Sequence, residues 1–180
     1  MHLTNYSINK MSEDYAKLEA TSDVLTDTQG TKRTLSALYK SLAASGVDVD
    51  KIKTNISDTC GKIMQIYGPM IEHQLSAVTN CKPNVNSKLF QILGFDLLID
   101  RDLNVWVLEV NDHPSLNIYH DTEAMGSIKR MDDSDICPVD LHVKSSLIID
   151  SVSLAKKSFE TVKDTDDFGC LSRVHPKGSD

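Results

Sequence analysis

The pattern of apolar positions predicts two helices, a β-hairpin and a further helix along the chain. Apolar residues recur every three or four positions within residues 32–44 and again within residues 48–75, which is the period of a helix with one buried face. Gly46 follows the first repeat, as expected just beyond a helix end. Pro69 lies inside the second repeat, so we expect a kink or two consecutive helices there. The two stripes comprise Leu35, Leu38, Tyr39 and Leu42, and then Ile52, Ile56, Cys60, Ile63, Tyr67, Met70 or Ile71, and Leu75.

The second half of the chain changes character and predicts the hairpin and the last helix. Residues 89–99 and 105–110 are strongly apolar, and the polar stretch 100–104 between them is a turn by composition. A helix is expected over about 138–161, with Pro138 in its first turn. Its expected buried side carries Leu141, Ser145, Ile148, Val152 and Ala155.

The remaining segments are expected to be short or irregular. Residues 2–9 suggest a short extended segment, and residues 10–31, 80–87 and 111–137 are predicted loops. Residues 163–180 are expected to form a disordered tail. The elements together predict an α/β fold of the α+β kind, with an antiparallel sheet packed by helices.

Composition and charge exclude several classes of protein. The chain has 180 residues, with 19 Lys and Arg against 26 Asp and Glu, and a net charge of −7, which argues against nucleic acid as a partner. No run of 18 or more apolar residues is present, so a membrane span is not expected. The four cysteines form no CxxC pair, and reduced thiols are expected.

Two acidic residues of the hairpin are the strongest chemical signal in the sequence. If two or four residues form the turn, Asp96 lies directly opposite Glu109, and Asn111 shares their face. The other face would carry the core residues Phe95, Leu97, Ile99, Trp106, Leu108 and Val110. Opposed carboxylates repel, so a basic side chain or a hard cation should compensate, and an all-oxygen set suits Mg²⁺ better than zinc. A solvated polar face is the alternative interpretation, and a three- or five-residue turn would put the acids on opposite faces.

Four motifs in a fixed order resemble the tubulin–tyrosine ligase-like family of ATP-grasp ligases. The hairpin string FQILGFDLLIDRDLNVWVLEVNDHPSLN is similar to the metal-binding hairpin of that family. The other three motifs are HLTNYSINK at the start, the segment 30–33 (GTKR) and the segment 139–144 (VDLHVK). The resemblance covers about residues 2–160 and only the carboxy-terminal part of the family's catalytic core. It therefore predicts a partial ATP-grasp domain over residues 1–162, followed by the tail at 163–180.

The resemblance implies a reaction and a set of site residues. Family members use ATP to phosphorylate a carboxylate, which an amine then attacks to form an amide. Mg²⁺ would be held by Asp96, Glu109 and Asn111. The family positions near the nucleotide match Thr4 and Asn5, and those near the incoming amino acid match Tyr6, Ser7, Lys32 and Lys144. No catalytic acid or base is assigned. Each lysine could instead be a solvated surface charge.

The implied function is addition of glutamate to tubulin, because Lys144 matches a lysine of glutamate-adding members. The implied partners are tubulin tails or another acidic protein, and free glutamate, with no nucleic acid and no membrane. The implied location is cytoplasmic and cytoskeletal, with the cilium or basal body as more specific sites. Alternatives are tyrosine or glycine ligation, and a non-catalytic module that binds metal or tubulin. Since an ATP-grasp site lies between two lobes, the isolated chain is expected to be inactive.

Overall fold

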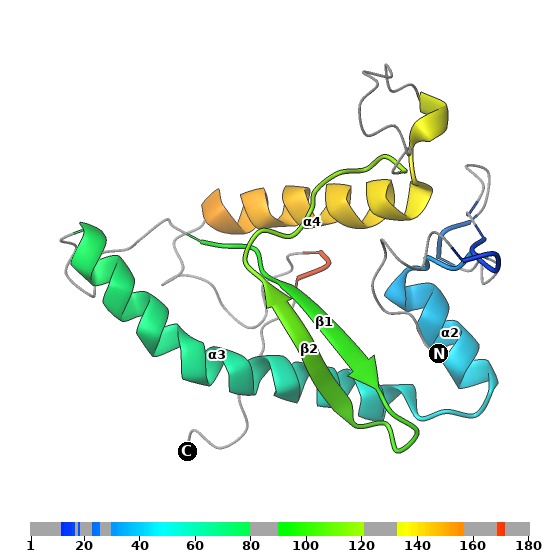
Figure 1. Ribbon diagram of the computed structural model, residues 1–180, viewed down its shortest axis with the longest axis horizontal. Helices are drawn as coiled ribbons and strands as arrows, with labels where there is room; N and C mark the ends of the chain where they lie inside the picture. The colour runs from blue at the N-terminus through cyan, green and yellow to red at the C-terminus, as the bar shows by residue number, and fades with distance from the viewer. Residues whose placement is uncertain are drawn as a thin grey trace. The chain divides into compact units, whose positions relative to one another are not determined.

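The computed structural model describes residues 12–16, 18, 23–25, 30–79, 90–120, 133–156 and 169–171. The described elements are α2 (Leu35–Ala44), α3 (Val49–Thr79), β1 (Gly94–Ile99), β2 (Val105–Asn111), the 3-10 turn η1 (Asp133–Asp135) and α4 (Pro138–Lys156) (Figure 1). The expected mixed fold, with helices and an antiparallel sheet, is confirmed. The segment 2–9 and the loop 80–87 lie outside the described residues, as does all of the tail except 169–171.

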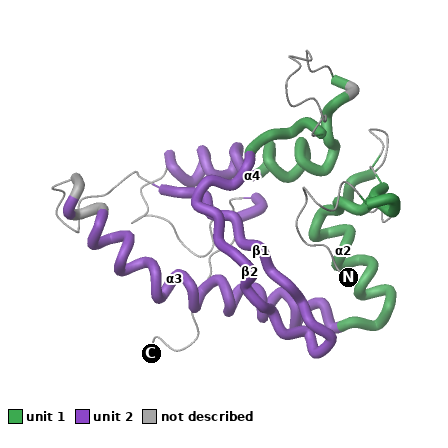
Figure 2. Tube along the Cα trace, in the orientation of Figure 1, with its two compact units in different colours: residues 1–47, 116–146 green, residues 48–115, 147–180 purple. Residues whose placement is uncertain are grey.

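The chain divides into two compact units (Figure 2). One unit comprises residues 1–47 and 116–146, and the other comprises residues 48–115 and 147–180. Helix α4 begins in the first unit and ends in the second. Each unit carries its own part of the predicted site.

Helix α2 of the first unit is bounded by specific caps at both ends. Thr34 is the N-cap, because its hydroxyl oxygen accepts from the Ala37 amide at 3.1 Å and the hydroxyl donates to the Val24 carbonyl at 2.8 Å. At the other end, Gly46 has φ +80° and the Val47 amide donates to the Leu42 carbonyl at 3.0 Å, which is a Schellman motif. The predicted helix is confirmed, beginning three residues later than expected.

The buried face of α2 matches the predicted stripe only in part. Leu38, Tyr39 and Leu42 are half-buried, but Leu35 is 58% exposed, and Ala37, outside the predicted stripe, is fully buried. The buried core of this unit comprises Leu18, Cys137 and Val139, with Val24 packed against it. Gly30 lies close to this core, since a Cβ at that position would be 3.2 Å from the Leu18 side chain. Small side chains therefore allow the segments of this unit to approach one another closely.

Helix α3 of the second unit runs without a break through Pro69, so the alternative of two consecutive helices is wrong. Asp48 caps its start, accepting from the Lys51 amide at 3.0 Å. Gly68 has no Cβ to clash with the proline ring, which explains why the helix continues, and Figure 1 shows a bend along its length. Ile52 is 1% exposed, but the apolar stripe towards the other end of the helix is exposed at Met64, Tyr67, Met70 and Ile71.

The hairpin confirms the pairing of Asp96 with Glu109, but a different turn length combined with a β-bulge produces it. The Asp100 amide donates to the Asn104 carbonyl at 3.0 Å, so three residues lie between the last paired positions, and the expected two- or four-residue turn is wrong. Such a turn alone would set Asp96 opposite Leu108. Between the Asp96–Glu109 and Leu97–Val107 pairs, Leu108 of β2 has no paired residue on β1. This β-bulge shifts the register by one residue and restores the Asp96–Glu109 pair.

The bulge also changes which side chains share a face. Leu97 pairs with Val107 and Leu98 pairs with Trp106, so Trp106 lies on the Asp96 face rather than on the core face. The prediction for Trp106 is therefore wrong; its side chain is 59% exposed. On β1 the predicted alternation is confirmed, with Phe95, Leu97 and Ile99 half-buried and Asp96 and Leu98 exposed.

Helix α4 is confirmed, but its buried stripe lies one residue earlier than predicted. Leu141, Ile148 and Val152 are exposed. Val139 is buried, and the buried or half-buried positions that follow helical spacing are Asp140, Lys144, Leu147, Ser151 and Leu154. Of the predicted stripe, Ala155 is half-buried. Apolar residues occur all around this helix, so their spacing did not single out one face. Within the described residues, no helix is both long and apolar enough to cross a membrane.

Candidate functional site

The hairpin brings the three predicted metal ligands together. Asp96 and Glu109 are direct partners across the two strands, and Asn111 lies two residues further along β2. The Asn111 Nδ2 group donates to Asp96 Oδ2 at 3.2 Å and to Glu109 Oε1 at 3.1 Å. The three side chains therefore converge on one point of the exposed face of the hairpin.

The two carboxyl groups titrate as a pair. Partial desolvation raises the pKa of Asp96, as do its hydrogen bond with Glu109 and the Glu109 charge, while the Asn111 amide opposes them. The pKa of Glu109 is lowered by the hydrogen bonds from Asn111 and from Asp96. A proton held by Asp96 thus relieves the repulsion between the two groups, which is the role that a cation would take over.

The chemistry of this set fits Mg²⁺. Two carboxylates and one carboxamide supply only oxygen ligands, and Mg²⁺ commonly keeps water or phosphate oxygens for its remaining positions. The amide of Asn111 would have to turn to present its oxygen, an exchange of two nearly indistinguishable groups. The described residues contain no group of three or more His, Cys, Asp and Glu that could hold a metal.

The hairpin is held in place on both sides of this cluster. At the tip, Asp100 accepts from the Trp106 indole at 2.8 Å and from the Asn104 amide at 2.8 Å. Helix α3 anchors the turn, since Asn55 Nδ2 donates to the Leu103 carbonyl at 2.8 Å. At the base, Gly94 allows Pro114 to approach, because a Cβ on Gly94 would lie 3.1 Å from the Pro114 Cβ. These contacts fix the strands that carry the acids.

The first unit brings together the two predicted substrate-binding lysines. Asp140 contacts both of them, with Oδ2 on the Lys32 ammonium and Oδ1 3.0 Å from the Lys144 ammonium. Lys144 also donates to the carbonyl of Asn117. The side chains are poorly exposed, at 9% for Asp140 and 19% for Lys144. The surface-charge interpretation therefore does not describe Lys144.

Asp140 is ionised in spite of its burial. Burial raises the pKa of the carboxyl group, but hydrogen bonds from Lys32, Lys144 and the Cys137 thiol outweigh that effect and lower it. Sequence reasoning missed Asp140. The signal that could have found it is its i,i+4 spacing from Lys144 on one helix face.

The other predicted site residues are not brought into these clusters. Thr4, Asn5, Tyr6 and Ser7 lie outside the described residues, so their roles at the nucleotide and the amino acid stay predictions. The Asp96–Glu109–Asn111 set belongs to one unit and the Lys32–Asp140–Lys144 set to the other.

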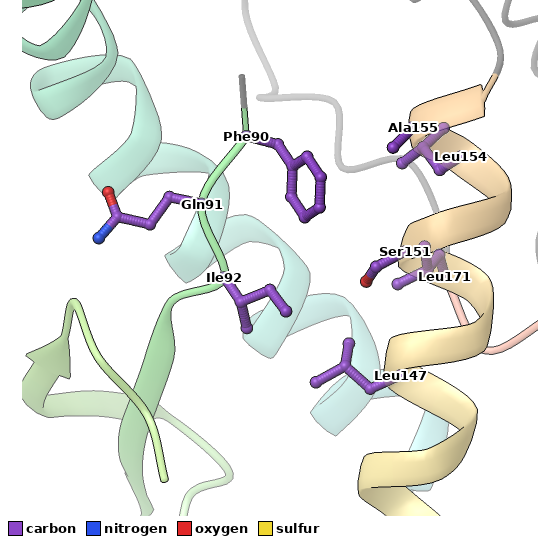
Figure 3. A pocket seen from close by; sticks show the side chains of 8 residues that line it. All are labelled: Phe90, Gln91, Ile92, Leu147, Ser151, Leu154, Ala155 and Leu171. Carbon is purple, nitrogen blue, oxygen red and sulfur yellow. The ribbon is translucent and has the colours of Figure 1, made fainter. Parts of the chain in front are cut away.

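Two apolar cavities of the second unit contain none of the predicted site residues. One has a volume of about 240 Å³, and Figure 3 shows Phe90 and Ile92 facing side chains of α4, among them Leu147 and Leu154. The other, of about 320 Å³, lies among Ile63, Met64, Tyr67, Ile71, Leu93 and Val110. Neither offers the convergent polar groups expected of a catalytic cleft.

The fold and the site define a mixed α/β protein in which an antiparallel hairpin brings two carboxyl groups and one carboxamide together on one face. The model of the tubulin-tyrosine ligase family matches residues 1–130, and the chain belongs to that family. The expected family resemblance is thereby confirmed.

Several curated relatives are tubulin polyglutamylases. The chain is 41% identical over 117 residues to tubulin polyglutamylase ttll6 of Danio rerio, covering 64% of this chain and 14% of the relative. It is 32% identical over 191 residues to tubulin polyglutamylase TTLL7 of Xenopus tropicalis, covering 100% of this chain and 19% of the relative. Tubulin polyglutamylase TTLL5 of Mus musculus is 34% identical over 152 residues, covering 83% of this chain and 10% of the relative. The chain thus spans less than a fifth of the length of these relatives.

Proposed function

We propose that the chain forms part of an ATP- and Mg²⁺-dependent ligase that joins glutamate to tubulin. The observation that carries this proposal is the convergence of Asp96, Glu109 and Asn111 on one face of the hairpin. Membership of the tubulin-tyrosine ligase family and the polyglutamylase names of the relatives support the reaction class and the acceptor. We also propose a cytoskeletal location, with the cilium or basal body as its more specific form.

The hairpin residues would supply the electrostatic part of the reaction. Asp96 and Glu109 would bind the cation through their carboxylates, and Asn111 would add its amide oxygen. When bound, Mg²⁺ neutralises the negative charge on the transferring phosphoryl group. The contacts at the turn and at the base of the hairpin hold these side chains in place before a cation binds. The entropy cost of ordering the ligands on binding is therefore smaller.

The lysine cluster would supply the specificity for an acidic amino acid. Lys32 and Lys144 place two ammonium groups on the Asp140 carboxylate. A carboxylate of the incoming glutamate would accept hydrogen bonds from these ammonium groups. Thr4 and Asn5 are proposed for the nucleotide, and Tyr6 and Ser7 for the amino acid, on the resemblance of their motif alone.

Thermal unfolding of the 180-residue chain tests the cation and nucleotide site. Mg²⁺ with a non-hydrolysable ATP analogue should raise the midpoint of the wild-type chain, since a ligand at 100 times its Kd stabilises by about 2.7 kcal/mol. Asp96→Asn should lose this rise. The same variant should be slightly more stable than wild type without Mg²⁺, because the repulsion with Glu109 is removed.

A matched control is Asp102→Asn, which removes an exposed carboxylate from the tip of the same hairpin. Its midpoint should rise with the ligands as in the wild type. A wild-type chain whose midpoint does not respond, or an Asp96→Asn chain that responds fully, would contradict the proposed site.

A chimera tests the reaction itself. This chain would replace the segment that it matches in tubulin polyglutamylase TTLL7 of Xenopus tropicalis, and transfer of labelled glutamate to tubulin would be measured. We expect transfer that Asp96→Asn abolishes and Asp102→Asn leaves intact. Transfer of labelled tyrosine or glycine instead would reject the choice of glutamate, and an inactive chimera that still binds Mg²⁺ would favour a non-catalytic module.

A further inference from the structure

Residues Gly169, Cys170 and Leu171 lie beside helix α4 in the second unit, although no motif of the sequence assigns them a role. We propose that these three residues form a latch, which binds α4 and closes the apolar pocket of about 240 Å³ next to that helix. The proposal is independent of the ligase reaction, because none of the predicted site residues lines this pocket.

The latch is anchored by the carboxylate of Asp150 on α4. The Cys170 amide donates to Asp150 Oδ2 at 2.8 Å. Hydrogen bonds from the Cys170 thiol and from its amide lower the pKa of Asp150, so the acceptor is an ionised carboxylate. Hydrogen bonds to an ionised group are about twice as strong as those between neutral groups. A single residue of the latch thus makes two of the stronger kind of contact to the helix.

Gly169 allows the backbone of the latch to approach this carboxylate. Its φ is +65°, in the left-handed region that L side chains rarely adopt. A Cβ at this position would also lie 2.5 Å from Asp150 Oδ2 and 2.7 Å from Oδ1, which is closer than a side chain can pack. Glycine is therefore required twice, by the backbone conformation and by the contact with Asp150.

Leu171 places an apolar side chain at the pocket. It lines the pocket together with Leu147 of α4, and Figure 3 shows Phe90 on the opposite side. The wall that carries Phe90 is held separately, since the neighbouring Gln91 donates through Nε2 to the Asp112 carbonyl at 2.8 Å. With that wall and α4 in place, the position of Leu171 determines how far the pocket is open to water.

The contacts of the latch are few enough for it to open while the unit stays folded. Cys170 is exposed and Leu171 is only half-buried. Segments held by few buried apolar contacts open at a lower free energy than the core of a protein. On opening, the Cys170 thiol would lose its contact with Asp150 and the pocket would lose Leu171 at the same time.

Alkylation of Cys170 in the 180-residue chain, followed by mass spectrometry, tests the latch. Burial, the hydrogen bond to Asp150 and the Asp150 charge all raise the pKa of the Cys170 thiol, which keeps the reactive thiolate scarce. Gly169→Ala should open the latch and raise the alkylation rate of Cys170 by about threefold or more. The rate of Cys60, a half-buried thiol on α3, should stay unchanged if the unit remains folded.

The matched control is Gly46→Ala. Gly46 also has a positive φ, of +80°, but a Cβ there would meet nothing within 4 Å. This variant carries the same kind of backbone strain at the end of α2, and it should leave the alkylation rate of Cys170 as in the wild type.

Leu171→Ala tests whether the anchor and the pocket act together. It should raise the alkylation rate of Cys170 by about twofold or more, because loss of the pocket contact favours the open latch. This variant keeps Gly169 and Asp150, so it remains informative if Gly169→Ala fails to fold. Unchanged Cys170 rates in both variants would overturn the latch. A faster rate in Gly169→Ala with an unchanged rate in Leu171→Ala would overturn the closure of the pocket.

Discussion

Asp140 is a buried carboxylate whose charge is retained because three donors reach it, two from its own segment of the chain and one, Lys32, from 108 residues away. Lys32, Lys144 and the Cys137 thiol all contact it. In the sequence it stands in the segment VDLHVK, where the family resemblance implies a role only for the lysine. A single residue in the sequence does not reveal that it bridges two others, because the bridge depends on Lys32, which is far away in the chain.

Asp140 gives the first unit a pH-dependent stability. Its folded-state pKa is lowered, so its contribution is fully present above the unfolded pKa of about 4 and is lost as the pH falls through the lower, folded value. Asp140→Asn should therefore lower the free energy of unfolding by about 1–3 kcal/mol at pH 7, and by much less near pH 2.

Urea unfolding of wild type and variant across this pH range would measure that difference. Asp50→Asn, on an exposed pair, should show almost no difference at any pH. The difference in the free energy of unfolding between wild type and Asp140→Asn should shrink as the pH falls. A difference that stays constant from pH 7 to pH 2 would argue against the ionised carboxylate as its source.

At the scale of the elements, the sequence predicted which segments are helical and which form the hairpin. The turn residues and the 3.6-residue period are local signals, and α2, the start of α3 and the strands follow them. Which face of each helix or strand is buried was less predictable. The bulge in β2 moves Trp106 to the opposite face, and the buried polar pair Asp140–Lys144 sets the inner side of α4.

The hairpin turn contains a strained residue, and this gives a prediction. Leu103 has φ +66°, a conformation that costs an L-residue other than Gly, Asn or Asp about 1 kcal/mol or more. Leu103→Gly and Leu103→Ala both remove the side chain, but only glycine removes the strain. Leu103→Gly should therefore be more stable than Leu103→Ala by about 1 kcal/mol.

Arg101 supplies the control, because its φ is not positive and the order should reverse. Arg101→Ala should be more stable than Arg101→Gly by about 0.5 kcal/mol, since glycine only adds freedom to the unfolded chain. Urea denaturation of the four variants would give both differences. Equal stabilities of the two Leu103 variants would show that the turn is not strained.

At the scale of the whole molecule, the described residues expose many large apolar side chains. Most of these lie on α3, on β2 and on α4, and they include Ile66, Trp106 and Ile149, which are 59–65% exposed. The predictions of a largely buried hairpin face and of a buried stripe along all of α3 were made from periodicity, which shows that a face is apolar but not what covers it. The chain matches less than a fifth of the length of its relatives, so its own residues need not supply that cover.

These surfaces predict how the purified chain behaves in solution. The 180-residue chain should bind a hydrophobic dye and associate as its concentration rises, which fluorescence and sedimentation velocity would measure. Ile66→Glu and Ile149→Glu together should reduce association and change stability by less than about 0.5 kcal/mol. Ile52→Ala, at a position 1% exposed, should instead cost about 2–4 kcal/mol. A chain that stays monomeric and binds no dye at high concentration would contradict this prediction.

The bulge at Leu108 has a consequence for how sequences of this kind are aligned. The extra residue of β2 lies between the tip of the hairpin and Glu109. The strand pairing near the tip is therefore offset by one residue from the pairing near the base. A relative with one residue fewer in this strand could lose the bulge and still keep its two acids opposite each other. An alignment gap would then belong inside β2 and not in the turn, and the spacing between the aspartate and the glutamate would vary among relatives while their contact is preserved.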